Sequence, residues 1–176
     1  MIKVDVSKED AAKIKRAFSA LSENALHKAL DAAGRRAAKH GVTEGTKKLR
    51  EVYTVKAGIA KSRVKVEHSN PLNSVIRIEG GTESVRNFRG TRSRKDGVFV
   101  SIKKGGGGLV PRSFTKGGVF LMREGADRYP LKGIYGPSVP QMFGEESVLD
   151  ATMTAAMEMY EKRIIHEIER RAGGAS

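Results

Sequence analysis

Residues 63–79, RVKVEHSNPLNSVIRIE, contain two short runs in which apolar and polar residues alternate, one on each side of a turn signal. Alternation over residues 63–67 and again over residues 74–79 has the period of a half-exposed strand. Asn70-Pro71 lies between the runs and is typical of a chain reversal. The stretch therefore predicts a β-hairpin.

Long helices are expected on both sides of this hairpin. Ser7 is suited to cap the first helix, whose apolar residues recur every three or four positions until a predicted end near His40-Gly41. A shorter helix is expected over residues 42–52. After Gly144 the helical period returns and predicts a second long helix to about Arg171, with a frayed end at residues 172–176. The two apolar stripes are Ala11, Ile14, Phe18, Leu21, Ala25, Ala29, Ala33 and Ala37 in the first helix, and Leu149, Met153, Ala156, Met157, Tyr160, Ile164 and Ile168 in the second.

Two further strands are expected between the hairpin and the last helix, at residues 97–102 and 118–122. The order helix, about four strands, helix predicts an α+β fold in which both helices bury one face on a small antiparallel sheet. The sequence contains no internal repeat and no long linker. It therefore predicts a single domain over residues 1–176.

Positive charge is concentrated in the middle of the chain. The net charge is +13, and residues 86–116 hold nine bases against one acid, Asp96. We expect residues 84–116 to form a long, flexible basic arm with a glycine-rich tip at residues 103–108. Such an arm can bind phosphates or an acidic protein surface. Its nine candidate contact residues are Arg86, Arg89, Arg92, Arg94, Lys95, Lys103, Lys104, Arg112 and Lys116.

Residues 128–143 are apolar and rich in proline but have no regular period. Such a stretch either covers the core or presents a docking surface for another chain. Apolar residues also occur within the basic arm, which favours ordering of the arm against a neighbouring protein over contact with DNA. The candidate docking residues are Phe88, Phe99, Tyr129, Pro130, Ile134, Tyr135, Val139, Met142 and Phe143.

No pattern in the sequence predicts catalysis, a metal site or a cofactor. The absence of cysteine excludes disulfides and thiol nucleophiles, and the four histidines do not have metal-ligand spacing. The glycines at 105–108 are not followed by the Lys-Ser/Thr and helix that a phosphate-binding loop requires. The longest apolar runs are too short to span a membrane, and the first residues lack the apolar region of a secretory signal. We therefore expect a protein without enzymatic activity.

An ordered set of segments resembles the prophage minor tail protein Z family. The set is Arg112-Ser113-Phe114, then residues 118–123 (GVFLMR), then residues 128–131 (RYPL), then residues 136–143 (GPSVPQMF). The resemblance extends over about residues 5–171 in layout and is specific over about residues 109–143.

The resemblance implies a structural protein of a tailed bacteriophage or prophage. Such a protein would complete the tail at its head-proximal end, as a ring, hexameric by analogy, that joins the tail to the head connector. The implied partners are sister subunits and tail-terminator, tail-tube or connector proteins, with possible contact to DNA in the channel. The implied location is the virion neck, and the host cytoplasm during assembly. The alternative reading is a non-specific nucleic-acid-binding protein that uses the basic middle segment.

Overall fold

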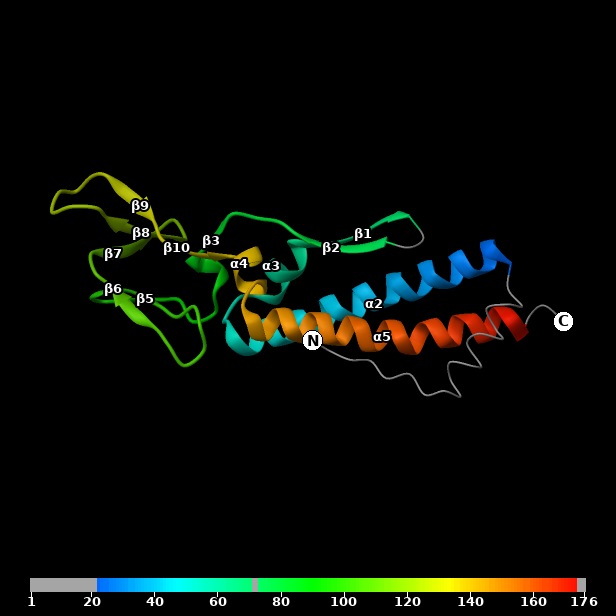
Figure 1. Cartoon of the computed structure of the whole chain (residues 1–176). Helices are drawn as coiled ribbons and strands as arrows, with labels where there is room; N and C mark the ends of the chain where they lie inside the picture. The colour runs from blue at the N-terminus through cyan, green and yellow to red at the C-terminus, as the bar shows by residue number, and fades with distance from the viewer. Residues whose placement is uncertain (1–21, 71–72, 174–176) are drawn as a thin grey trace. The chain divides into compact units, whose positions relative to one another are not determined.

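The structure is a computed structural model that describes residues 22–70 and 73–173. It has an α+β fold with a long helix toward the N-terminus, several short antiparallel strands and a long C-terminal helix, which confirms the predicted fold class (Figure 1). The predicted cap at Ser7 and the stripe positions from Ala11 to Leu21 lie outside the described residues.

The first long helix, α2 (Glu23–Val52), differs from the predicted helix at both ends. It begins after Ser22, whose hydroxyl accepts a hydrogen bond from the Ala25 amide at 3.4 Å and whose carbonyl accepts one from Leu26 at 3.0 Å. Ser22 is thus the N-cap of α2. The helix then continues through Gly41, where the sequence predicts an end. Gly41 is buried inside the helix and does not form a C-terminal turn.

The chain forms two compact units, each built from separate stretches. Unit 1 takes its described residues from Met1–Val42, Val66–Ile76 and Met153–Ser176, and unit 2 consists of Thr43–Lys65 and Arg77–Thr152. The helices α2 and α5 (Glu146–Gly173) each contribute to both units. The single domain expected over residues 1–176 stays a prediction.

Unit 1 contains two helical segments, from α2 and α5, that lie side by side (Figure 1). It also contains most of a two-stranded hairpin formed by β1 (Val64–Asn70) and β2 (Asn73–Ile78). The first two residues of β1 and the last two of β2 belong to unit 2. The hairpin confirms the prediction from residues 63–79. The α2 face that packs in unit 1 is made of small side chains, with Ala29 and Ala33 completely buried. A hypothetical Cβ on Gly34 would lie 2.8 Å from Ser74 Oγ, so the hairpin also approaches α2 closely.

The C-terminal helix does not bury its predicted stripe. Ile168 is buried, but Met153, Met157 and Tyr160 are exposed to between 37% and 55% in unit 1, and Leu149 is exposed to 49% in unit 2. The α5 residues that are buried instead are Val148, Thr152 and Glu167. The buried residues of α5 therefore differ from the predicted stripe. The two polar ones are hydrogen-bonded, Thr152 to the Val148 carbonyl and Glu167 to Arg36.

Unit 2 contains several small sheets in place of the single sheet that the sequence predicts. In the described residues, β3 pairs with β10, β4 with β5 and β6, and β7 with β8 and β9, all antiparallel. The predicted strands at residues 97–102 and 118–122 correspond to β5 and β8. The bounds are β3 (Thr82–Ser84), β4 (Arg92–Arg94), β5 (Gly97–Val100), β6 (Gly108–Val110), β7 (Ser113–Lys116), β8 (Val119–Arg123), β9 (Leu131–Gly133) and β10 (Tyr135–Ser138), with the short helices α3 (Ala57–Ser62), η1 (Val85–Asn87) and α4 (Val139–Phe143).

Short turns explain why the strands are brief. Gly117 and Gly118 connect β7 to β8, and both have positive φ angles, +57° and +76°. Two consecutive residues with positive φ form the tight hairpin turn whose twist matches that of the strands. Alternation therefore breaks at each glycine-rich turn, and a sheet predicted from a few longer runs becomes several short hairpins.

Two clusters of buried apolar side chains form the interior of unit 2. The larger cluster includes Leu49, Tyr53, Val55, Phe88, Val139, Met142 and Phe143. The smaller cluster is Val85, Val98 and Ile134. Ser113 joins two sheets beside it, because its hydroxyl accepts a hydrogen bond from the Val98 amide at 2.7 Å and donates one to the Val110 carbonyl at 2.5 Å.

Candidate functional site

Every one of the nine basic residues predicted to contact a partner is exposed. Arg86 lies in η1, Arg92 and Arg94 lie in β4, and Lys116 ends β7. The others lie in the connections next to these strands. All nine belong to unit 2, and among them Arg92 and Arg94 lie over the same ring, that of Phe99. We call these nine residues the basic surface.

Few carboxylates neutralise the basic surface. Among the described residues, Lys103 is the one member with a carboxylate within ion-pair distance, Glu145 at 3.1 Å. Over residues 82–138 the sequence has twelve bases and four acids. Two of those acids are already engaged, because Glu83 is buried against Arg63 at 3.0 Å and Glu124 pairs with Lys132 at 3.4 Å. The surface therefore carries a strong net positive potential.

Two arginines of the basic surface are held in place by an aromatic ring. Arg92 and Arg94 lie over the Phe99 ring at 5.0 and 4.7 Å from its centroid, and Arg92 is the register partner of Phe99 across β4 and β5. Arg123 lies in the same way over Phe114 at 5.5 Å. Cation–π contacts hold guanidinium groups in place without consuming their hydrogen-bond donors. These donors stay available for phosphate or carboxylate groups.

The structure contradicts the prediction that residues 84–116 form a flexible arm. They contain η1 and four strands, β4 to β7, paired in regular register. Phe88 and Val98 are buried, with 1% and 0% of their surface exposed. The apolar residues that suggested anchors for a neighbouring protein pack inside the chain's own unit 2. The basic side chains consequently project from a folded scaffold.

The predicted docking residues divide into two groups. Five of them are buried in unit 2, which makes them core residues and corrects their assignment to a docking surface: Phe88, Ile134, Val139, Met142 and Phe143. Tyr129, Pro130 and Tyr135 are exposed, and Phe99 is half-buried beneath its two arginines. Residues 128–143 were expected either to cover the core or to present a docking surface. The end of this stretch packs in the core, because α4 contributes Val139 and Met142 to the larger cluster.

A cluster that sequence reasoning missed joins Tyr53, Lys103 and Glu145 within unit 2. The Tyr53 hydroxyl donates to Glu145 Oε2 at 2.5 Å, and Lys103 Nζ lies 5.4 Å from the centroid of the Tyr53 ring. Burial, together with the bond to Glu145, raises the pKa of Tyr53 to about 12. The bonds from Tyr53 and then Lys103 hold the pKa of Glu145 below its usual value. Neither group changes charge near pH 7, so the cluster is suited to fixing the start of α5 and not to proton transfer.

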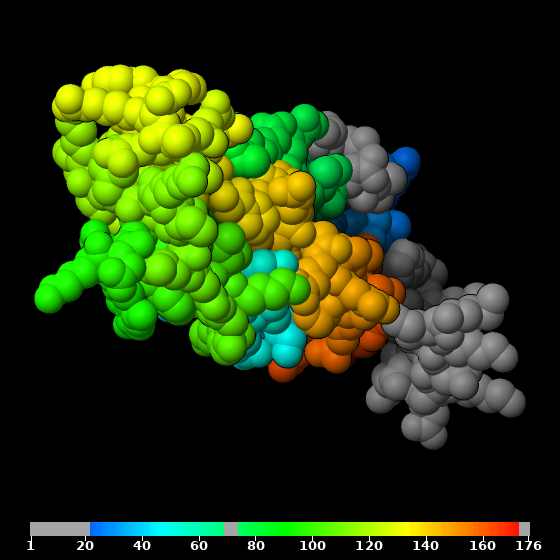
Figure 2. Space-filling model, turned by 90° about the vertical axis from the view of Figure 1, so that its left-hand side faces the viewer, coloured from blue at the N-terminus to red at the C-terminus, as the bar shows by residue number. Residues whose placement is uncertain are grey.

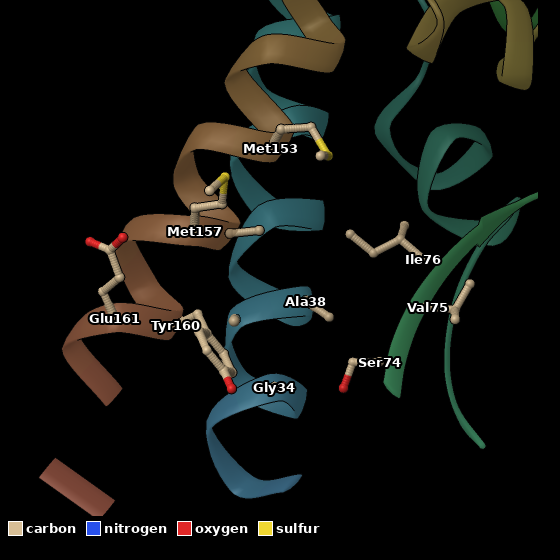
Figure 3. Close-up of a pocket in the computed structure, with 11 residues that line it drawn as sticks. Gly34, Ala38, Ser74, Val75, Ile76, Met153, Met157, Tyr160 and Glu161 are labelled. Carbon is tan, nitrogen blue, oxygen red and sulfur yellow. The ribbon is translucent and has the colours of Figure 1, made fainter. Parts of the chain in front are cut away.

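Unit 1 has a groove of about 540 Å³ between its helices and strand β2. Figure 3 shows Met153, Met157 and Tyr160 along α5, Gly34 and Ala38 on α2, and Ser74 and Ile76 on β2 around it. The remaining lining residues are Ala37, Val75, Ala156 and Glu161. The lining is mostly apolar, with Glu161 as its one charged residue among those described.

The described residues contain no group of three or more histidine, aspartate or glutamate side chains that could hold a metal ion. Within the same part of the chain, no helix combines the length and the apolar character needed to cross a lipid bilayer. The basic surface belongs to residues 86–116, which are coloured green to yellow-green in Figure 2, and is the strongest candidate for a functional site. Comparisons of the chain with protein-family models, curated proteins and solved structures found no match, so the resemblance to the minor tail protein Z family stays a prediction.

Proposed function

We propose that this chain is a structural protein of a tailed bacteriophage or prophage that completes the tail at its head-proximal end. The chain assembles as a ring, a hexamer by analogy, and joins the tail to the head connector without catalysing a reaction. It resides in the virion neck after assembly in the host cytoplasm. The observation that carries the proposal is the folded basic surface, most of which directly precedes, along the chain, the segments that resemble the tail-protein family.

A folded basic surface suits a joint in a particle. Complementary charge brings partners together quickly and selects against wrong ones. Arg92 and Arg94 are already positioned by Phe99, so less side-chain entropy is lost when they bind. An acidic tail-tube or connector surface is the partner that these groups fit. Exposed Tyr129 and Tyr135 supply aromatic area of the kind enriched in interfaces.

The test is the native mass of the purified chain, alone and mixed with the tail-tube, tail-terminator or connector protein of the same phage. We expect a ring-sized species in at least one mixture. A chain that stays monomeric in every mixture contradicts the proposal.

Two variants with equal changes in net charge test whether assembly depends on the basic surface. Reversing three of its charges, Arg89→Glu, Arg92→Glu and Arg94→Glu, is expected to leave a folded monomer that fails to assemble. The control reverses three exposed lysines elsewhere, Lys28→Glu, Lys61→Glu and Lys162→Glu, and is expected to assemble normally. Equal loss of assembly in both variants would show that net charge alone matters.

Non-specific nucleic-acid binding is the second candidate, and the uncompensated charge of the basic surface favours it. It predicts that the logarithm of DNA affinity falls linearly with the logarithm of salt concentration, by about 0.9 for each phosphate contacted. A flat salt response excludes this candidate. The surface offers few aromatic side chains on which bases could stack, because Phe99 and Phe114 already lie under arginines.

A further inference from the structure

We propose that one face of the β7–β8–β9 sheet binds α5 of a second copy of the chain, at the apolar side chains that α5 leaves exposed in unit 1. The sheet face is the one that carries Phe114, Val119 and Leu121, and we call it the outer face. A contact between two different surfaces of identical copies builds a ring when the rotation closes. The inference thus names the contact between neighbours in the proposed ring, and it rests on the proposed function only for that closure.

Strand β8 contains an unbroken run of four apolar residues, Val119-Phe120-Leu121-Met122. Phe120 and Met122 pack against the smaller core cluster. Since neighbouring residues of a strand point to opposite faces, Val119 and Leu121 lie on the outer face. Unbroken apolar runs are typical of strands that are covered on both faces, whereas a strand with one solvated face alternates. The run therefore indicates that the outer face is covered as well.

The outer face is apolar across all three strands. Leu121 is the register partner of Phe114 in β7 and of Gly133 in β9. The Tyr135 ring covers Gly133, since a hypothetical Cβ on Gly133 would lie 2.8 Å from Tyr135 Cε2. Val119 is exposed to 46% and Tyr135 to 60%. Neither core cluster of the described residues includes any of these five residues, so the face is an apolar patch of the kind that marks an interface.

Positive charge borders the outer face at both ends. Lys116 is the register partner of Val119 beside the β7–β8 turn, and Arg123 lies on the same face at the other end of β8. Both basic residues are exposed. Glu124, the nearest acid along the chain, is already paired with Lys132 at 3.4 Å. A partner surface that fits here has an apolar centre with acidic residues beside it.

The exposed side of α5 in unit 1 has this character. Met153, Met157 and Tyr160 follow one another at intervals of four and three residues, so they lie along one side of the helix. They are exposed to between 37% and 55%. Residues 153–161 contain two acids and no base. One of the acids, Glu161, lines the groove together with the three apolar side chains (Figure 3).

A second copy of the chain is the partner whose charge fits both surfaces. The outer face is basic and apolar, and the exposed side of α5 is acidic and apolar. Pairing of two outer faces, or of two α5 helices, would place like charges opposite each other, which disfavours both arrangements. Pairing of the sheet of one copy with α5 of the next opposes unlike charges and covers apolar side chains on both.

Cross-linking tests the contact in the full chain, which contains no cysteine. One sample carries Val119→Cys on the outer face, and the other, with an affinity tag, carries Met157→Cys on α5. The two samples are mixed and treated with a short bis-maleimide, which tolerates small differences in register. The control replaces Met157→Cys with Lys162→Cys, an exposed residue five positions further along α5 and therefore on another side of the helix.

We expect the main cross-linked product to join one copy of Val119→Cys to one copy of Met157→Cys, with little product in the control. Products that join two copies of the same variant, in equal or greater amount, would overturn the proposal, because like surfaces would then be in contact. Equal yields with Met157→Cys and Lys162→Cys, or no cross-linked product, would overturn it as well.

Charge reversal gives a second test, by sedimentation velocity of the chain alone. Reversal on the sheet, Lys116→Glu with Arg123→Glu, or on the helix, Glu158→Lys with Glu161→Lys, gives both surfaces the same sign. Each double variant is expected to weaken self-association at least about tenfold. All four substitutions in one chain restore opposite signs and the parent net charge, so we expect self-association to return. A fourfold variant that is folded by circular dichroism yet stays monomeric would contradict the contact.

Both measurements use the chain alone, so their outcome is separate from that of the proposed function. Cross-linking at this contact, in a chain that forms no ring with any tail protein, would refute the tail role and leave the contact standing. A ring that forms with tail proteins, but whose subunits do not cross-link here, would leave the tail role standing and refute the contact.

Discussion

Glu167 is a buried carboxylate in unit 1 that is surrounded by arginines. Its side chain is 1% exposed, and its carboxylate accepts hydrogen bonds from Arg36 and Arg170 at 2.8 Å each and from Arg171. Burial alone would raise the pKa of this carboxyl, but the hydrogen bonds and charges of Arg171 and Arg170 outweigh it and hold the pKa below its usual value. The group is thus a buried ion network that holds α2 and α5 together in unit 1.

Replacing the carboxylate with an amide, Glu167→Gln, is expected to destabilise the protein by about 1–3 kcal/mol at neutral pH, because charged hydrogen bonds are lost. The folded pKa is lowered, so this contribution is complete above the usual carboxyl pKa of 4.5 and disappears as the pH falls through the folded value. Urea unfolding followed by circular dichroism measures the difference.

The control for Glu167→Gln is Glu169→Gln, two residues along the same helix and exposed. It is expected to change stability by less than about 0.5 kcal/mol. A difference between the parent chain and Glu167→Gln that stays constant from pH 7 to well below 4.5 would contradict the role of the carboxylate charge.

Gly45 lies where the structure has no room for a side chain. A hypothetical Cβ at Gly45 would lie 2.0 Å from Thr152 Oγ1, which is held by its bond to the Val148 carbonyl at 2.7 Å. We expect Gly45→Ala to destabilise the protein by about 1–3 kcal/mol through overpacking. Gly58 has no atom within 4 Å of its hypothetical Cβ, so Gly58→Ala is expected to stabilise α3 by up to about 1 kcal/mol. Thermal unfolding of the two variants should therefore shift in opposite directions.

Among the elements, the short strands of unit 2 depend on contacts that are not part of their ladders. Ser113 begins β7, yet its hydroxyl binds the Val98 amide of β5 and the Val110 carbonyl of β6. Val98 and Val110 are register partners, so one side chain links the sheet that carries Arg92 and Arg94 to the next one. Two three-stranded sheets are thereby held as one scaffold for the basic surface.

Ser113→Ala removes this link and leaves the buried Val98 amide without its partner. We expect a loss of about 1–3 kcal/mol and faster hydrogen exchange at the amides of β5, which mass spectrometry of peptides can follow. Ser93→Ala, an exposed residue in β4, is the control and should leave both unchanged. Unchanged exchange in Ser113→Ala would show that the ladders suffice without the link.

Secondary structure was predicted correctly where apolar residues recur with a clear period and incorrectly where they do not. Alternation at residues 63–79 identified the β1–β2 hairpin, and the helical period identified both long helices. The helix end predicted near Gly41 was wrong because α2 continues to Val52. Of the four strands β4 to β7 in the predicted arm, the sequence indicated only β5, because β4, β6 and β7 are three or four residues long and show no apolar–polar alternation. At the candidate site the sequence identified the exposed bases. It could not identify the Tyr53–Glu145 contact, which joins residues 92 positions apart.

At the scale of the whole molecule, charge is distributed unevenly along the chain. Residues 82–138 hold twelve bases and four acids, whereas residues 145–171 hold four bases and seven acids. An uneven distribution of this kind makes attraction to polyanions depend on where the bases lie and not only on net charge.

Heparin or duplex DNA can measure this attraction. Reversal of Arg89, Arg92 and Arg94 to glutamate is expected to reduce the slope of log affinity against log salt by about 2 to 3 units, because each lost phosphate contact removes about 0.9. The variant with Lys28, Lys61 and Lys162 reversed has the same net charge and is expected to keep most of the parent slope. Identical slopes for the two variants would show that binding does not use the basic surface.

The interleaving of the two units along the chain has a consequence for synthesis. The chain passes between units at residues 42–43, 65–66, 76–77 and 152–153. A ribosome has therefore made all of unit 2 by Thr152, while unit 1 still lacks α5 from Met153 onward. Since domains generally fold as their residues emerge, the strands that carry the positive charge complete their fold first. Truncation of the last twenty residues would spare them and remove Glu167, the α5 residue that binds Arg36 of α2.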